Sequence, residues 1–181
     1  MTTPATPITV RTTLLILGML TTVSSSLLAM SFVPPERRIV HSATHAFELV
    51  VDPRSEVHSV RHSSWPHRRL WSFRAPVWHD DYFVSSDGRR VVVVRSKFCG
   101  TDALDASAVE VYCEGRLERE FSYRSISRPR RYRPGEPGPI GAFWRIWQTG
   151  TWQKGERVYI RTTGTGTKCI DLTNGKLTKA P

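Results

Sequence analysis

The sequence is poor in several residue types, and each shortage limits what the protein can be. Its three cysteines, Cys99, Cys113 and Cys169, are too few and too unevenly spaced for a disulfide framework or a paired-cysteine zinc site. Its 16 acidic residues are outnumbered by 26 Lys and Arg, which gives a formal net charge of +10. This excess favours anionic partners such as lipid headgroups, acidic polysaccharide or nucleic acid. A basic surface that is merely solvated explains the excess equally well.

Motifs for nucleophilic catalysis and phosphate binding are also missing. The chain has no Gly-x-Ser-x-Gly and no Ser-x-x-Lys pattern. Residues 164–168, Gly-Thr-Gly-Thr-Lys, lack the spacing of a phosphate-binding loop, so a turn between two strands is expected there. No catalytic residue and no cofactor is therefore predicted, and whether the protein is an enzyme stays open, with a non-enzyme favoured.

Residues 12–33 form a long apolar run. These 22 positions carry no charge, and a helix of that length crosses a hydrocarbon core of about 30 Å. The apolar density is strong at Leu14–Leu20 and weak at Thr21–Ser26, which suits either a signal peptide or an uncleaved anchor. We therefore expect residues 1–35 to be a signal peptide or an N-terminal membrane anchor with one hydrophobic helix. A single domain at residues 36–181 follows.

The charges around this run give conflicting signals on orientation. Arg11 precedes it, whereas Arg37 and Arg38 follow it, so a count of positive charges opposes export. Long domains often cross a membrane regardless of such a bias, and export is the expectation. It places the domain in the cell envelope, on the periplasmic side of the inner membrane or secreted. A cytoplasmic-facing, nucleic-acid-binding domain is the opposing hypothesis.

The centre of the domain is predicted to be a tight β-hairpin. Asp87-Gly88 stands between two runs of β-branched and aromatic residues, which is a strong signal for a two-residue turn. Val91–Val94 are too apolar for a strand with one wet face, so this strand is expected to be covered on both sides. The turn predicts two cross-strand pairs, Val84 with Val91 and Phe83 with Val92.

Further turns and strands indicate an all-β domain, an antiparallel meander in the form of an open twisted sheet or a small sandwich. A turn at Glu114-Gly115 and another at Asn174-Gly175 are expected between strands. Residues 125–141 contain four prolines and three glycines, so they are predicted to be a long Pro/Arg-rich loop without regular structure. These turns predict three pairs: Tyr112 with Leu117, Glu110 with Arg119, and Leu172 with Leu177.

One stretch resembles a known repeat. Trp78 is followed by the turn Ser85–Gly88, the apolar strand Val91–Val94, a strand Val109–Tyr112 that ends in an aromatic residue, and a turn at Gly115. This order is similar to one blade of the TolB/PD40 class of β-propeller repeats, although Ser86 stands where that family often has proline. The resemblance implies blade-like hairpins and a role in binding partners, and it brings no catalytic residue.

A second, poorer copy of the repeat is expected over Trp147–Leu177, where residues 170–176 resemble a closing hairpin. Propellers need four or more blades to close their ring. The roughly 145 residues of the domain provide at most three, at about 40 residues per blade. The resemblance therefore implies blade-like hairpins rather than a closed propeller, unless copies assemble.

Two basic segments are the predicted binding surface. Guanidinium groups suit phosphate and carboxylate, and neighbouring aromatic rings can stack on sugars or bases. The first segment lies at the start of the long loop and the second lies near residues 65–74. The predicted partner- or anion-binding residues are Arg124, Arg128, Arg130, Arg131, Tyr132, Arg133, Arg68, Arg69 and Trp71. The alternative is a pair of solvated loops with no specific ligand.

Histidines and tryptophans offer weaker candidates. His41 and His45 are four residues apart, which on a strand is about 13 Å, too far to share one ion. No metal site is predicted, although His79-Asp80-Asp81 is dense in ligand atoms. The tryptophans suit either a sugar-binding shelf or the core, and core packing is favoured. They are Trp71, Trp78, Trp144, Trp147 and Trp152.

These observations lead to one preferred function and one alternative. The preferred function is an exported, membrane-associated, non-catalytic binding or assembly module. It is attached through residues 12–33 and contacts an anionic surface, an anionic polymer or an envelope protein. Nucleic acid is a disfavoured partner because export is expected, and the sequence leaves the oligomeric state open. The alternative is an envelope hydrolase, metal-dependent in one version, that uses the region of His79, Asp80 and Asp81.

Overall fold

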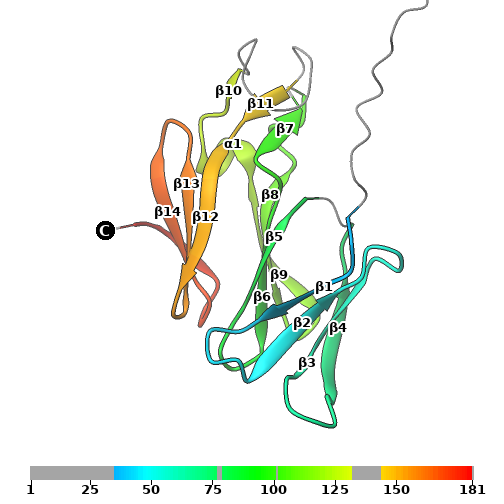
Figure 1. The fold of residues 1–181 in the computed structure, drawn as a ribbon. Helices are drawn as coiled ribbons and strands as arrows, with labels where there is room; N and C mark the ends of the chain where they lie inside the picture. Colours follow the sequence, from blue (N-terminus) through cyan, green and yellow to red (C-terminus); the bar gives the residue numbers. More distant parts are fainter. Residues whose placement is uncertain (1–34, 77–78, 101, 132–143, 181) are drawn as a thin grey trace, which may run out of the picture. The chain divides into compact units, whose positions relative to one another are not determined.

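The computed structural model describes residues 35–76, 79–100, 102–131 and 144–180, and their fold is all-β (Figure 1). Four antiparallel sheets are present, and three of them are four-stranded meanders that follow one another along the chain. The first meander contains β1 (Arg38–His41), β2 (Phe47–Val51), β3 (Val57–His62) and β4 (Arg69–Arg74). The middle meander contains β5 (Asp81–Val84), β6 (Arg90–Val94), β8 (Ser107–Cys113) and β9 (Arg116–Ser122). The third contains β12 (Gln148–Lys154), β13 (Arg157–Thr162), β14 (Gly166–Asp171) and β15 (Lys176–Lys179).

The valine strand β6 is covered on both faces, as predicted. Its side chains alternate between the two faces of the middle meander. Val91 and Val93 belong to a core cluster shared with the first meander, whose members include Leu49, Val51, Val60 and Phe73. Val92 and Val94 belong to a second cluster shared with the third meander, whose members include Val158, Ile160, Ile170 and Leu172. The middle meander therefore packs against the first meander on one face and against the third meander on the other.

The central hairpin has the predicted register. Val84 pairs with Val91 and Phe83 pairs with Val92. Gly88 has a φ of +68°, which glycine adopts without the penalty that a Cβ brings. The Asp87 side chain accepts hydrogen bonds from the Ser85 hydroxyl at 2.6 Å and from the Arg89 backbone N–H at 2.9 Å, which fixes the turn.

Two predicted cross-strand pairs are wrong, one because of a register shift and the other because of a longer turn. Tyr112 pairs with Leu117 as expected, but a register shift between Val111 and Tyr112 places Glu110 opposite Glu120 instead of Arg119. The closing hairpin is also longer than a two-residue turn: Ile170, not Leu172, pairs with Leu177. Its turn is closed by a hydrogen bond from the Gly175 N–H to the Asp171 carbonyl at 2.7 Å.

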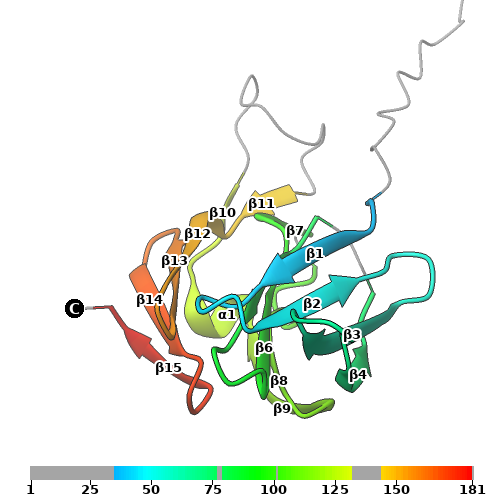
Figure 2. The same ribbon diagram turned by 60° about the horizontal axis from the view of Figure 1, so that its bottom comes forward.

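A small three-stranded sheet and one helical turn complete the described fold (Figure 2). The sheet has the order β10 (Arg130–Arg131), β11 (Trp144–Ile146) and β7 (Phe98–Gly100). The helical turn α1 (Tyr123–Ile126) begins after Ser122, whose hydroxyl accepts from the Ser125 N–H. Part of the predicted loop 125–141 is therefore ordered, which corrects the expectation of no regular structure. The remainder of that loop, from residue 132, is outside the described residues.

The predicted leader or anchor at residues 12–33 also lies outside the described residues. Within the ranges that are described, no helix has the length and apolarity needed to cross a bilayer. Cys99, Cys113 and Cys169 are all free thiols. Burial raises the pKa of the Cys99 thiol to about 11, so this group is a neutral core residue.

Candidate functional site

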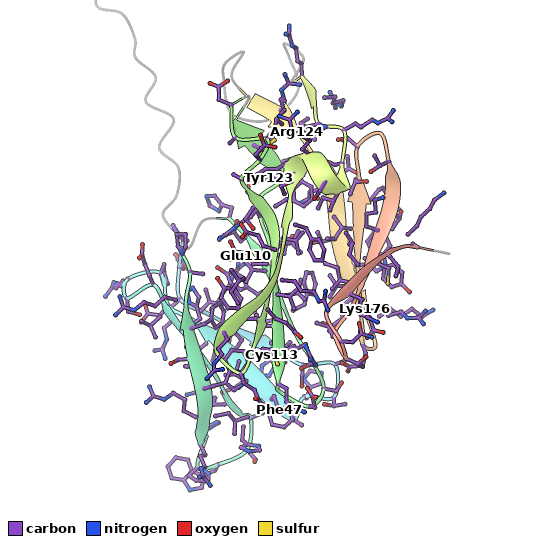
Figure 3. All side chains as sticks on the ribbon, turned by 180° about the vertical axis from the view of Figure 1, so that it is seen from behind. Phe47, Glu110, Cys113, Tyr123, Arg124 and Lys176 are labelled. Atoms are coloured by element: carbon purple, nitrogen blue, oxygen red, sulfur yellow. The ribbon has the colours of Figure 1, made fainter. Side chains whose placement is uncertain are left out.

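The first predicted basic segment lies on α1, β10 and the residues between them (Figure 3). Arg124 is exposed and its guanidinium forms an ion pair with the carboxylate of Asp105 at 2.8 Å. The Arg128 backbone N–H donates to the Thr163 carbonyl at 2.8 Å, and its side chain is exposed. Arg130 and Arg131 are exposed on β10. Tyr132 and Arg133 fall outside the described residues.

The second predicted segment lies at the edge of the first meander. Arg68 and Arg69 are exposed, and Trp65 in the same loop is 86% exposed. Trp71 is different because it is half-buried against the core cluster, and its indole N–H donates to the Gly88 carbonyl at 2.8 Å. Trp71 therefore joins the first meander to the turn of the middle one, and its ring is part of the packing.

The two predicted segments are attached to different sheets. Arg68 and Arg69 belong to the β3–β4 hairpin of the first meander, whereas Arg130 and Arg131 pair with Ile146 and Arg145 in the small sheet. They are therefore two separate basic patches.

The three residues of the His79-Asp80-Asp81 region have different surroundings. Asp80 is 1% exposed and bound from two sides: the Arg95 guanidinium donates at 2.8 Å and the Ser96 N–H donates at 2.9 Å. Asp81 accepts a hydrogen bond from the Thr151 hydroxyl at 2.5 Å. His79 and Asp81 line an open cavity of about 420 Å³ together with Lys97. Only two of the three predicted residues therefore face a space that a ligand can enter.

A buried ionic network contains Asp80. Arg95 also donates to Glu110 at 2.6 Å, and the Tyr112 hydroxyl donates to the other oxygen of Glu110 at 2.8 Å. Burial by itself lowers the pKa of Arg95, but the two adjacent carboxylates outweigh burial and raise it above the ordinary value. Burial, followed by the hydrogen bond to Glu110, raises the pKa of Tyr112. The charges of Arg95, Asp80 and Glu110 are therefore paired with one another inside the fold.

The histidines do not form a metal centre among the described residues, where no group of three or more His, Cys, Asp or Glu side chains is arranged to hold an ion. His58 is fully buried; its Nε2 donates to the Ala75 carbonyl at 2.9 Å and its Nδ1 accepts from the Asp52 N–H. Burial lowers the pKa of His58 below its ordinary value. Its two hydrogen bonds fit the neutral imidazole.

A buried carboxylate on β2 attracts two more histidines. Glu48 is 4% exposed and accepts from the Arg61 Nε at 2.5 Å. The Nδ1 atoms of His41 and His67 lie 3.8 and 3.6 Å from its oxygens. Arg61 already provides a positive charge at this carboxylate, so the cluster is an ion-pair site rather than a metal site.

The outward face of the third meander is a basic surface that the sequence prediction missed. Strand alternation places Val158, Ile160 and Ile170 in the core, and the residues between them on the opposite face. That opposite face, called the basic face below, carries four exposed cations: Lys154, Arg157, Arg161 and Lys176. The cations are 22 residues apart in sequence at most, and only the strand register brings them together. The sequence pattern that indicates this basic face is therefore the alternation of core and charged residues within each strand, and not a local run of charge.

Comparison with known proteins assigns no family. No protein-family model matches this chain, and no curated protein matches it significantly.

Proposed function

We propose that this protein is an exported, membrane-associated, non-catalytic binding or assembly module whose partner is an anionic surface or an envelope protein. The observation that carries the proposal is the separation of its charges. The buried carboxylates of Glu48, Asp80 and Glu110 are each held by an arginine inside the fold. The exposed surface therefore keeps an excess of positive charge from residues such as Arg69 and Arg131.

The arrangement of the sheets supports a role in binding. Three consecutive four-stranded meanders pack through shared core clusters, and the stack leaves an outward sheet face on its first and third members. As part of the proposal, we extend the likeness to TolB/PD40 blades from Trp78–Leu117 to all three meanders. Basic residues occur on both outward faces, including Arg69 and Arg74 on one and Arg157 and Arg161 on the other. Like charges disfavour closing a ring by joining these two faces.

Export is tested by the location of the C-terminus. Alkaline phosphatase and a cytoplasmic reporter, each fused after residue 181, distinguish the two sides of the membrane. The proposal expects phosphatase activity from the first fusion, because that enzyme is active only after export. Reporter activity without phosphatase activity contradicts the export part of the proposal and favours the cytoplasmic-facing, nucleic-acid-binding domain.

Binding to an anionic surface is tested with the two predicted patches. Full-length protein is mixed with vesicles of phosphatidylglycerol and phosphatidylcholine, and with vesicles of phosphatidylcholine alone. We expect binding only to the anionic vesicles, with weaker binding at high salt. Substitution of Arg130, Arg131 and Arg133 by serine, or of Arg68 and Arg69 by serine, identifies which patch contributes. Unchanged binding in both variants excludes the two patches as the contact surface.

The cavity beside His79 and Asp81 favours a second candidate function, an envelope hydrolase. Its volume of about 420 Å³ is in the range of small-ligand sites. Substitution of Asp81 by asparagine is expected to abolish any hydrolytic activity found in the purified protein. Metal analysis of the same preparation tests the metal-dependent version, which a metal-free and active sample contradicts.

A further inference from the structure

From the charge and the aromatic content of the basic face, we infer that the third meander carries a binding site for an acidic polysaccharide. The inference rests on the proposed function, because it names one surface and one ligand class for an anion-binding module. The basic face is an unpartnered sheet face in the described structure, and its occupant is identified below from charge complementarity and from the groups that surround the cations.

The strand register arranges the basic face in rows. Trp152, Tyr159, Cys169 and Thr178 pair across all four strands and form the central row. Lys154, Arg157, Asp171 and Lys176 form the next row, and Arg161 lies beside Trp152 on the other side. Neighbouring strands are about 4.8 Å apart. A polymer that runs across the strands can therefore meet Lys154 and Arg157 on neighbouring strands, and then Lys176 beyond Asp171.

The aromatic part of the face is exposed but held in place. Trp152 is 39% exposed, and its ring is stacked on Tyr159 with centroids 5.3 Å apart and an angle of 9° between the planes. The Arg161 guanidinium lies 5.6 Å from the centre of the Trp152 ring. The exposed apolar surface is thus one fixed edge on a sheet and not a protruding tip, which suits contact with a sugar ring better than insertion into a bilayer.

The charge of the face is strongly positive. Asp171 is its one carboxylate among the described residues of these rows, and it already accepts from the Thr173 N–H at 2.8 Å and the Thr173 hydroxyl at 2.6 Å. The hydrogen bonds from Thr173 lower the pKa of Asp171 and keep it ionised within its own turn. Asp171 also interacts electrostatically with Arg157, so four cations outweigh one carboxylate on this face and can attract carboxylate or sulfate groups from a ligand.

A cavity of about 390 Å³ opens among these cations. Two cations, Arg157 and Lys176, and the Asp171 carboxylate line it together with neutral groups, so charged and neutral hydrogen-bonding groups surround the same space. The neutral lining residues are Cys169, Asn174 and Thr178. Carboxylate or sulfate beside hydroxyl groups is the functional pattern of an acidic sugar. A nucleic acid offers phosphate and flat bases, but the stacked Trp152–Tyr159 pair leaves no gap between its rings for a base.

The test uses full-length protein in a neutral detergent, with heparin as the acidic polysaccharide and dextran as the neutral one. Binding to heparin is expected, binding to dextran is not, and the affinity is expected to fall as salt rises. The double variant Arg157→Ser/Lys176→Ser is expected to weaken heparin binding by roughly tenfold or more, because two charge-assisted contacts are removed. Trp152→Ala is expected to weaken it by roughly three- to tenfold.

The matched control is Arg116→Ser/Arg119→Ser, which removes the same charge from exposed positions of β9 and is expected to bind heparin like the wild type. Thermal unfolding of every variant confirms that the fold is kept. If the basic-face variant binds heparin normally while the Arg68/Arg69 or Arg130/Arg131 variants lose it, this inference is wrong and the proposed function stands. If the protein binds no anionic ligand at all, this inference and the anionic-surface version of the proposed function are both wrong.

Two further probes separate the ligand classes. Poly(dT) and phosphatidylglycerol vesicles are tested with the same variants. Tighter binding of poly(dT) than of heparin, with dependence on Arg157 and Lys176, overturns the polysaccharide assignment in favour of single-stranded nucleic acid. The same dependence with vesicles, and none with heparin, overturns it in favour of a lipid surface.

Discussion

The two faces of the middle meander are buried by different chemistry. Toward the third meander the buried core is apolar, with Val92, Val94 and Val111 against residues such as Ile160. Hydrogen bonds such as the one from Thr151 to Asp81 add to this contact. Toward the first meander it contains aromatic rings and the ionic network of Arg95. Apolar burial is non-directional and tolerates small shifts, whereas a buried ion pair is favourable in one geometry. We therefore expect the third-meander contact to provide stability, and the first-meander contact to add a fixed register and sensitivity to pH.

The largest effect is expected from removing the shared cation of the ionic network. Arg95→Ala leaves Asp80 and Glu110 buried without a positive partner, which is expected to lower the free energy of unfolding by about 4 kcal/mol. Urea unfolding measures this loss in the free energy of unfolding. The control is Arg89→Ala, which breaks the exposed Arg89–Glu114 pair and is expected to change stability by no more than about 0.5 kcal/mol. Equal effects of the two variants contradict the difference between buried and exposed pairs.

A slightly smaller effect is expected in the apolar contact. Ile160 is fully buried between the middle and third meanders. Ile160→Ala removes three carbons from a packed core, so the free energy of unfolding is expected to fall by about 3 kcal/mol. The urea midpoint reports the change. Ile160→Val serves as the graded control at about 1 kcal/mol, and a loss below that value for the alanine variant means that this contact is not closely packed.

The hairpin turn of the middle meander tests how the first meander docks. A Cβ added to Gly88 lies 2.5 Å from the Phe47 ring, and φ is +68° at this residue. Gly88→Ala is expected to destabilise the fold by about 2 kcal/mol, from strain and from the overlap together. Gly155 has a similar φ of +57° and nothing within 4 Å, so Gly155→Ala is expected to show the strain alone, about 1 kcal/mol. Equal losses exclude a tight contact between Gly88 and Phe47.

The smallest and most specific effect concerns pH. Because burial lowers the pKa of His58, the folded state binds fewer protons than the unfolded chain once the pH falls below about 6.5. Stability from this group is therefore complete above that pH and is lost as the pH falls, by at most about 1.4 kcal/mol per pH unit. His58→Gln is expected to remove this part of the dependence, measured by urea unfolding between pH 7 and 5. If the stability of the variant and that of the wild type change in parallel with pH, His58 is not the origin of the pH dependence.

The fold was predictable where the pattern depends on residues close in sequence. Asp87-Gly88 with Val91–Val94 predicted both the central register and a strand covered on two faces, and the structure has both. Pairing failed at Glu110 because a bulge depends on how two strands twist together.

The candidate sites were less predictable because they depend on contacts between distant residues. Asp80 was expected beside Asp81 in a possible catalytic region, but Arg95 and Ser96, about 15 residues away, bind it inside the fold. Trp71, which the sequence assigns both to the binding surface and to the tryptophans favoured for the core, is half-buried and donates its indole N–H to the Gly88 carbonyl. The basic face was missed because Arg157 and Lys176 are neighbours only through β14.

The chain order of the meanders has a consequence for biosynthesis. Val92 and Val94 emerge from the ribosome well before Ile170 and Leu172, the residues that shield them. At about 5–20 residues per second, an apolar surface stays uncovered for several seconds. The nascent chain therefore exposes an apolar sheet face, and a chaperone that holds unfolded chains is expected to bind the protein at that stage.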